Sequence, residues 1–254
     1  MGWPSFGIEG ATNHIVRFAS IASAVLLACS SASRTEEGKT IPPCHEDAMV
    51  VFDASGSMSG NEILGIPNSR ARIDEARSAL ARVLPNATKF RRVGLVSYGP
   101  GPWNQCNVKL DLKPMANAAG PIMSAVNAIV PAGRTPLTSG IEAAAEALDF
   151  RAKPGVVVVI TDGEETCGRA PCEIAKELHA AGYKLTVHVV AFKYESYSYG
   201  MSVLDLMCVA EENGGLYVRA NSEEELVEAL EKTLDCPMIS QAPLSFRAMS
   251  SQAE

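Results

Sequence analysis

The sequence has no run of lysine or arginine that would form a basic patch, and its formal net charge is -7. A protein dedicated to nucleic-acid binding is therefore not expected. The motifs GxGxxG, GxxxxGK and GxSxG are also missing, so the sequence does not support the chemistry that those loops serve. Hydrophobic residues make up 47% and charged residues 20% of the 254 residues, a globular balance that excludes disorder, collagen and coiled coil.

Long apolar runs are missing as well. Residues 18–28 read FASIASAVLLA, which has the length of the apolar part of a signal peptide and is too short to span a bilayer. We therefore predict an exported protein with a signal peptide (1–28), a linker (29–45), a folded domain (46–235) and a C-terminal tail (236–254). The string LLAC also resembles a bacterial lipobox with Cys29 as the lipidated residue. The predicted location is then periplasmic or at the cell surface, or the outer membrane for a lipoprotein.

From Asp47 onward, strands and helices alternate. Residues 155–162 form a continuous apolar run, which is typical of a central parallel strand covered on both faces. Residues 107–112 alternate as an edge strand does. The pattern predicts an α/β fold with a doubly wound, mostly parallel sheet flanked by helices and one antiparallel edge strand. The predicted strands are 48–53, 91–99, 107–112, 155–162, 184–192 and 216–220; the predicted helices are 69–85, ended by Pro85, and 118–130, 137–150, 171–182, 201–215 and 222–234.

Oxygen-bearing side chains follow two of the predicted strands. Asp53, Ser55 and Ser57 come directly after the first strand, and Asp162 ends the run GVVVVIT. Thr135 lies between them in the chain, in a turn that leads into a helix. Ligands of doubly wound sheets bind beyond the carboxyl ends of the strands. Two carboxylates and three hydroxyls there suit a hard divalent cation such as Mg²⁺.

These five positions resemble the metal-ion-dependent adhesion site (MIDAS) of von Willebrand factor type A domains, and the resemblance covers roughly residues 46–235. It implies that the hydroxyls of Ser55, Ser57 and Thr135 bind the metal directly, while Asp53 and Asp162 act mainly through bound water. The last coordination position would take a carboxylate from a partner. The resemblance thus implies an exported adhesion or scaffold module, not an enzyme, which uses Mg²⁺, with Mn²⁺ or Ca²⁺ as alternatives, to capture an exposed Asp or Glu of a protein.

Other functions remain open at this point. A metal-dependent hydrolase could use Asp53 and Asp162, and some family members are noncatalytic subunits that assist an ATPase. The two aspartates could also merely cap helices. Glu164 and Glu165 could add metal oxygens or form a solvated turn. None of the four histidines, His14, His45, His179 and His188, is expected at the carboxyl ends of the strands, so no histidine base is placed to act.

Aromatic residues occur in the two loops expected beside the metal. We predict that they bind a partner, because aromatic side chains often anchor interfaces, although they could equally pack their own loops. They are Trp103, Tyr194, Tyr197 and Tyr199.

Seven cysteines suit an oxidising compartment, and six remain when Cys29 is set aside. In a doubly wound sheet the first strand begins and the last helix ends at the same pole, so Cys44–Cys236 is a predicted disulfide. Cys167 and Cys172 bracket a short turn and form a second predicted pair, which leaves Cys106–Cys208 by elimination. Two alternatives are a bond from Cys106 to the Cys167–Cys172 loop and a free, buried Cys208 thiol.

Overall fold

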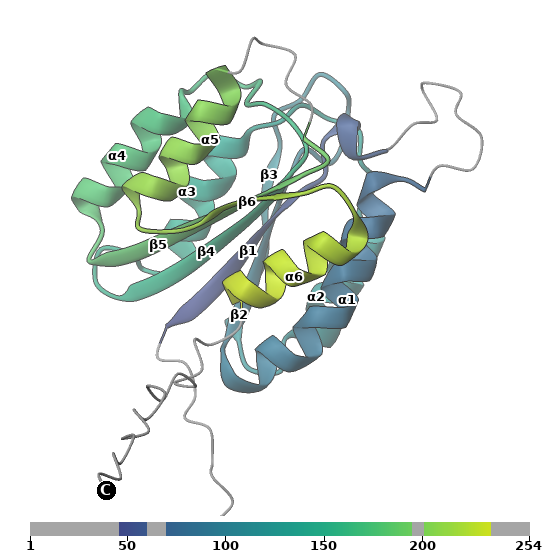
Figure 1. Ribbon diagram of the computed structural model, residues 1–254, viewed down its shortest axis with the longest axis horizontal. Coiled ribbons are helices and arrows are strands. Elements are labelled where there is room, and N and C mark those ends of the chain that lie inside the picture. Colours follow the sequence, from purple (N-terminus) through teal and green to yellow (C-terminus); the bar gives the residue numbers. More distant parts are fainter. Residues whose placement is uncertain (1–45, 60–69, 195–200, 235–254) are drawn as a thin grey trace, which may run out of the picture. The chain divides into compact units, whose positions relative to one another are not determined.

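The computed structural model describes residues 46–59, 70–194 and 201–234 (Figure 1). The predicted signal peptide and linker, and the predicted tail from residue 236 on, lie outside the described residues, as do Cys29, Cys44, Cys236, Tyr197 and Tyr199. Within the described ranges, no helix has the length and apolar character that crossing a membrane requires.

A six-stranded sheet forms the centre of the domain, with the strand order β3-β2-β1-β4-β5-β6. All neighbouring strands are parallel except β2 and β3, which are antiparallel, so β3 is the antiparallel edge strand. The predicted fold class is therefore confirmed. The strands are β1 (Asp47–Asp53), β2 (Val93–Tyr98), β3 (Val108–Met115), β4 (Pro154–Thr161), β5 (Lys184–Phe192) and β6 (Tyr217–Ala220).

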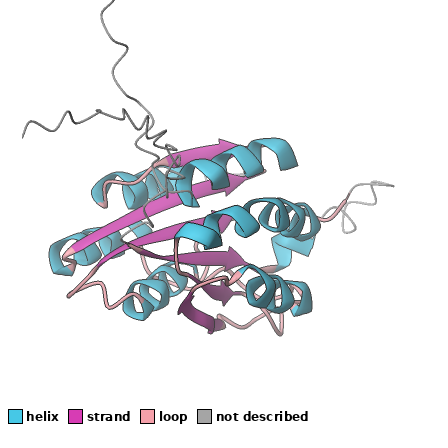
Figure 2. Ribbon diagram, turned by 90° about the horizontal axis from the view of Figure 1, so that it is seen from below, coloured by secondary structure: helices cyan, strands magenta, loops and turns pink. Residues whose placement is uncertain are grey.

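Helices cover both faces of the sheet, as Figures 1 and 2 show. One apolar core lies between the sheet and α1, α2 and α6, and a second lies between the sheet and α3, α4 and α5. The helices are α1 (Arg72–Phe90), α2 (Ala119–Ala128), α3 (Leu137–Ala147), α4 (Pro171–Ala181), α5 (Met201–Glu212) and α6 (Glu223–Leu234), with a short 3-10 helix η1 (Gly56–Ser59) after β1.

The central strands are apolar along most of their length because each of them contributes to both cores. In β1, Val50 and Phe52 belong to the core under α1, whereas Met49 and Val51 belong to the core under α3. The side chains alternate between the two faces, so a strand with helices on both sides needs apolar residues at every position. This requirement explains why a run such as VVVV in β4 indicates a central strand.

The first long helix continues through Pro85, so the prediction that this proline ends it was wrong. α1 runs from Arg72 to Phe90. Proline in a helix interior costs about 3 kcal/mol because it lacks an N–H and its ring crowds the preceding turn. Here Pro85 itself is exposed, while Leu84 and Ala87 remain buried against the sheet. The packing of this last turn outweighs the cost of the proline.

The sheet order places its topological switch point at the carboxyl ends of β1 and β4. After β1 the chain crosses through α1 to β2 on one side, and after β4 it crosses through α4 to β5 on the other. The carboxyl ends of two strands whose connections diverge in this way form the usual ligand site of a doubly wound sheet. Asp53 ends β1, and Asp162 follows β4 directly.

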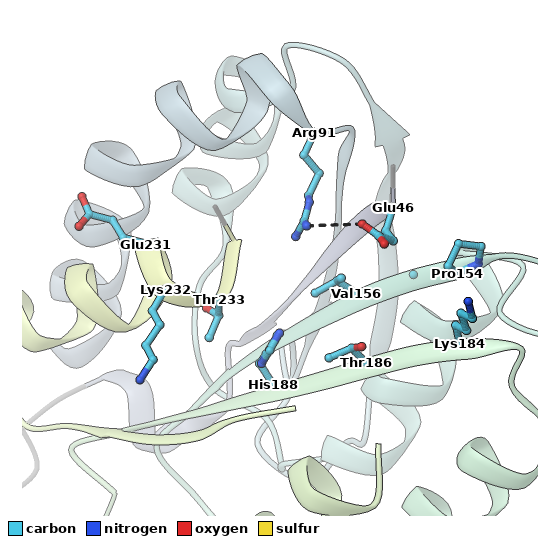
Figure 3. Close-up of a pocket in the computed structure, with 11 residues that line it drawn as sticks. Glu46, Arg91, Pro154, Val156, Lys184, Thr186, His188, Glu231, Lys232 and Thr233 are labelled. Atoms are coloured by element: carbon cyan, nitrogen blue, oxygen red, sulfur yellow. Dashed lines mark ion pairs between the residues drawn. The ribbon is translucent and has the colours of Figure 1, made fainter. Parts of the chain in front are cut away.

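The other end of the sheet carries a hollow of about 570 Å³, bordered by Arg91, Lys184, His188 and Lys232 among others (Figure 3). The imidazole Nδ1 of His188 accepts a hydrogen bond of 3.0 Å from the backbone N–H of Leu216. Burial, and secondly the positive charge of Arg91, lower the pKa of His188 to about 4. The neutral imidazole is therefore the form that the folded state favours.

Stability is expected to depend on pH through His188. The unfolded chain takes up the proton near pH 6.5 and the folded domain only near pH 4, so the stabilisation is complete above pH 6.5 and is lost as pH falls toward 4. After allowance for solvent screening of this part-exposed group, the loss is on the order of 2 kcal/mol. Urea unfolding of the parent and of His188→Gln at pH 7.5 and pH 4.5 measures it. An equal loss in both proteins would contradict the assignment.

Candidate metal centre

The five predicted ligand residues meet at the carboxyl ends of β1 and β4, and we call this group the strand-end site: Asp53, Ser55, Ser57, Thr135 and Asp162. A backbone bridge between Ser55 and Gly133 joins the turn after β1 to the turn that carries Thr135. The bridge includes a 2.9 Å hydrogen bond from the Gly56 N–H to the Gly133 carbonyl. Segments that are distant in sequence are thereby fixed side by side.

Short hydrogen bonds join the hydroxyls to the carboxylates. Ser55 Oγ donates to Asp53 Oδ1 at 2.5 Å, and Ser57 Oγ donates to Asp162 Oδ1 at 2.6 Å. The two Oγ atoms lie 3.0 Å apart. Each hydroxyl carries one proton, and when both carboxylates are ionised, both protons are directed to them. The lone pairs of the two serine oxygens therefore face each other, an arrangement that a neighbouring cation stabilises.

The hydroxyl of Thr135 borders the same space. A Cβ atom added to Gly163 would lie 3.4 Å from Ser57 Oγ and 3.8 Å from Thr135 Oγ1, so both oxygens lie next to that glycine. The Thr135 backbone N–H donates to Thr166 Oγ1 at 2.8 Å, and the Thr135 carbonyl accepts from the Thr166 N–H at 3.0 Å. These bonds fix the turn of Thr135 against the loop that follows β4.

Asp53 is fully buried, and both oxygens of its carboxylate accept hydrogen bonds. Besides the Ser55 hydroxyl and N–H on Oδ1, Oδ2 accepts from Tyr98 OH at 2.8 Å and from Thr161 Oγ1 at 2.9 Å. Burial raises the pKa of Asp53, and the four hydrogen bonds oppose that rise. The sequence placed Tyr98 at a strand end worth inspection but gave neither Tyr98 nor Thr161 a role, although each ends a strand at the predicted pole.

Asp162 is 2% exposed and forms an ion pair with Arg72 at the start of α1. The distance from Arg72 Nη1 to Asp162 Oδ2 is 2.9 Å. Burial, and then the negative charge of Asp53, raise the pKa of Asp162 to about 7, against the hydrogen bonds from Ser57 and Arg72. The two carboxylates thus lie in one buried site, and their combined negative charge favours the binding of a cation there. Sequence reasoning missed Arg72.

The chemistry of the donors fits a hard cation. The strand-end site offers two carboxylates and three hydroxyls, which are oxygen ligands of the kind that Mg²⁺ takes. Among the described residues, no group of three or more His, Cys, Asp or Glu side chains could hold a metal ion. His179 lies in the last turn of α4, and His188 lies in β5 beside the hollow at the other pole.

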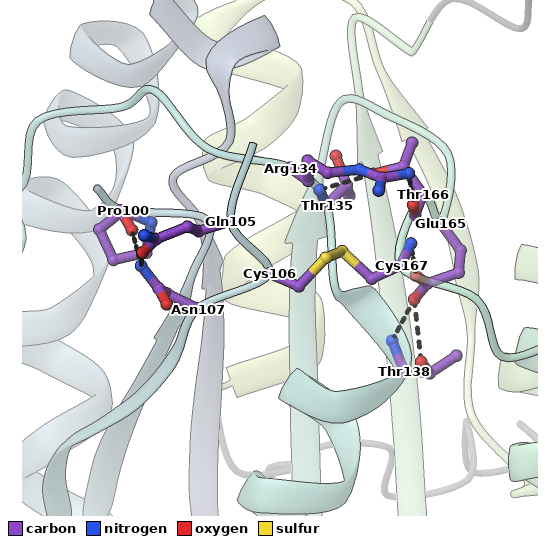
Figure 4. Close-up of a disulfide and its surroundings, with 10 residues drawn as sticks. All are labelled: Pro100, Gln105, Cys106, Asn107, Arg134, Thr135, Thr138, Glu165, Thr166 and Cys167. Carbon is purple, nitrogen blue, oxygen red and sulfur yellow. Dashed lines mark hydrogen bonds between the residues drawn. A yellow bond between two sulfur atoms is a disulfide. The ribbon is translucent and has the colours of Figure 1, made fainter. Parts of the chain in front are cut away.

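Glu165 stabilises the start of α3. The sequence had suggested either a metal ligand or a solvated turn for this residue. Its carboxylate accepts hydrogen bonds from the N–H and the hydroxyl of Thr138, at 2.8 Å and 2.9 Å, and from the N–H of Cys167 (Figure 4). Thr138 is the second residue of α3. A carboxylate at a helix N-terminus satisfies free N–H groups and interacts favourably with the helix dipole.

Two disulfides occur among the described residues, and neither is a first-choice prediction. Cys106–Cys167 joins the loop after β2 to the loop after β4, with a Cα–Cα distance of 6.0 Å, as the alternative pairing for Cys106 predicted (Figure 4). Cys172–Cys208 joins α4 to α5 at 5.3 Å. The predicted pairs Cys167–Cys172 and Cys106–Cys208 were wrong because α4 and α5 pack side by side, and because the two loops meet above the sheet.

The aromatic residues predicted to bind a partner differ in exposure. Trp103 is 79% exposed in the loop after β2. Tyr194 is only 7% exposed and packs in the core under α3, α4 and α5. The loop of Trp103 contacts the loop of Val130, which is 74% exposed, through a bridge between Pro100 and Pro131.

Known proteins resemble this chain in sequence. A family model described as von Willebrand factor type A domain matches residues 48–165. The chain is similar to the uncharacterized protein YwmC of Bacillus subtilis, with 28% identity over 207 residues that cover 78% of this chain and 86% of that protein.

Solved structures share the architecture at low identity. An aerotolerance-related membrane protein from Bacteroides fragilis superposes with a TM-score of 0.55 at 17% identity and covers 74% of this chain and 98% of its own. Proximal thread matrix protein 1 from the mussel byssus, with a zinc-occupied MIDAS motif, gives 0.54 at 18% identity over 76% of this chain and 46% of its own. Together with the sheet order, these likenesses show that the domain has the von Willebrand factor type A fold.

Proposed function

We propose that the strand-end site binds one divalent cation, Mg²⁺ in the first instance, and that the domain thereby captures an Asp or Glu side chain of a protein partner. The observation that carries the proposal is the 3.0 Å contact between Ser55 Oγ and Ser57 Oγ, whose protons are both directed to carboxylates. Such a contact is unfavourable unless a cation or an additional proton compensates the facing lone pairs.

The division of charge in the site supports capture of an anion. Ser55, Ser57 and Thr135 are neutral ligands, and Asp53 and Asp162 carry the negative charge one layer behind the serines. When bound, the cation supplies an open coordination position for an oxygen of a carboxylate. Because the neutral hydroxyls quench little of its charge, the attraction for that carboxylate remains large.

Exposed apolar side chains beside the site offer a surface to the same partner. Trp103 and Val130 lie on the two loops that the bridge between Pro100 and Pro131 joins, and both are largely exposed. The second of these loops leads to Thr135. An exposed tryptophan next to a charged site is a typical interface anchor. The proposed partner therefore presents an acidic residue with apolar neighbours.

The proposed place of action is outside the cytoplasm. Cys106–Cys167 and Cys172–Cys208 are typical of proteins from oxidising compartments. The predicted signal peptide 1–28 and the possible lipid anchor at Cys29 agree with this location. The zinc-occupied MIDAS motif of the mussel protein supports the use of a divalent metal by this fold.

Metal removal tests the proposal. Calorimetry with the purified chain and MgCl₂ or MnCl₂ is expected to give one site per molecule. A labelled peptide with one Asp beside two apolar residues should bind in Mg²⁺, lose binding in EDTA, and regain it when Mg²⁺ is restored. The same peptide with Asn in place of Asp is the control and should not bind. Peptide binding that persists in EDTA would exclude capture through the metal.

A further inference from the structure

Arg72 is an unusual residue for its position. It is the first residue of α1, where the helix dipole is positive and a cation is unfavourable. Its side chain is nevertheless only 15% exposed, and its Nη1 donates to Asp162 Oδ2 at 2.9 Å. Asp162 itself belongs to the strand-end site. The contact is thus a largely buried ion pair. The positive charge of Arg72 lies at the positive end of the α1 dipole, and its partner is a carboxylate that the proposed cation needs.

The second oxygen of Asp162 shows what the pair does to the site. Oδ1 accepts from Ser57, a proposed metal ligand, while Oδ2 accepts from Arg72. One carboxylate therefore connects the metal position to a fixed positive charge. With Asp53 and Asp162 ionised, Arg72 lowers the net negative charge of the site from two to one. A divalent cation that binds there meets this opposing charge.

We propose that Arg72 is a positioning residue that sets the affinity of the strand-end site for divalent cations. It holds Asp162 in place and compensates its buried charge in the metal-free protein, and it opposes the charge of a bound cation. Cation binding is thereby weakened and made dependent on the surrounding cation concentration. This inference rests on the proposed function, because it concerns the affinity for the same metal.

Charge-removing and charge-keeping variants separate this role from a merely structural one. Arg72→Gln should tighten Mg²⁺ binding about tenfold in calorimetry, because a positive charge close to the cation is removed. Arg72→Lys keeps the charge and should stay within about threefold of the parent. A residue that only shapes the site would instead lose affinity in both variants.

Arg70→Gln is the matched control. It removes the same charge two residues earlier, but Arg70 pairs with Glu223 of α6 and not with the strand-end site. Its Mg²⁺ affinity should equal that of the parent within about threefold. An effect as large as that of Arg72→Gln would mean that net charge, and not the contact with Asp162, sets the affinity.

Thermal unfolding in EDTA gives a readout without metal. Arg72→Gln should melt at a lower temperature than the parent, because Asp162 is left buried without a counter-charge, and Mg²⁺ should raise its melting temperature more than that of the parent. Unchanged or weaker Mg²⁺ binding by Arg72→Gln overturns the inference while parent binding still supports the proposed function. If the parent does not bind Mg²⁺, the proposed function fails. Mg²⁺ binding by Arg72→Gln but not by the parent would then support the inference about Arg72. If neither protein binds Mg²⁺, both the proposed function and the inference are overturned.

Discussion

Asp53→Asn is expected to lower the affinity for Mg²⁺ about 100-fold, at the upper end of what loss of an outer-layer ligand costs. The substitution removes one of the two buried negative charges and keeps the shape of the side chain. Asparagine can still accept from the Ser55 hydroxyl and N–H through its oxygen. Its NH₂ group then faces Tyr98 OH and Thr161 Oγ1, which can both turn to accept. Calorimetry with MgCl₂ measures the loss.

The stability of the same variant distinguishes a metal site from a structural carboxylate. Burial of a charge is costly, so Asp53→Asn should be at least as stable as the parent in EDTA. Asp47→Asn is the control, because Asp47 lies at the other end of β1 and pairs with Arg92 at the surface. It should bind Mg²⁺ as the parent does. Equal Mg²⁺ affinity in Asp53→Asn and the parent would refute the assignment of the site.

The fold could be predicted where a single element carries the signal. The apolar run of β4 indicates a strand between two helix layers, and the acidic first turn of α6 after Ser222 indicates a helix start. Both patterns follow from local geometry, the alternation of side chains in a strand and the free N–H groups of a helix end. Four positions of the strand-end site end or follow strands of this kind, and the resemblance to the metal-ion-dependent adhesion site added Thr135 and the roles of the ligands.

Contacts between distant segments could not be predicted in the same way. Arg72 reaches Asp162 across 90 positions, and Tyr98 reaches Asp53 across 45. These contacts depend on which strands are neighbours, and the sequence does not state the strand order. Pro85 shows the opposite error, since a strong local signal was overruled by packing along the buried face of α1.

The cysteine pairs illustrate the same limit and lead to a second prediction. Proximity in sequence suggested Cys167–Cys172, but the two disulfides link segments 61 and 36 positions apart. Cross-links that close loops of such lengths stabilise a domain by about 4 kcal/mol in chain-entropy models. We therefore expect Cys106→Ser/Cys167→Ser and Cys172→Ser/Cys208→Ser each to lower the free energy of unfolding by roughly that amount. Urea denaturation without reductant measures both.

Of the two disulfides among the described residues, the first is placed to support the proposed metal site. The turn of Thr135 lies between the two loops that Cys106–Cys167 joins: Gln105 O accepts from the Arg134 N–H at 2.9 Å, and Thr166 bonds to Thr135 on the other side. Figure 4 shows the disulfide between these loops. Loss of this bond leaves the Thr135 turn held by hydrogen bonds alone.

The two disulfide variants should therefore differ in metal binding although they lose similar stability. Cys106→Ser/Cys167→Ser is expected to bind Mg²⁺ about tenfold more weakly, the smaller loss that accompanies removal of support behind a ligand. Cys172→Ser/Cys208→Ser, which frees two helices of the α3, α4, α5 layer, is the matched control and should bind as the parent does. Calorimetry well below the melting temperature of each variant compares them. Equal affinities in both would show that the Thr135 turn keeps its place without the covalent link, because its backbone hydrogen bonds suffice.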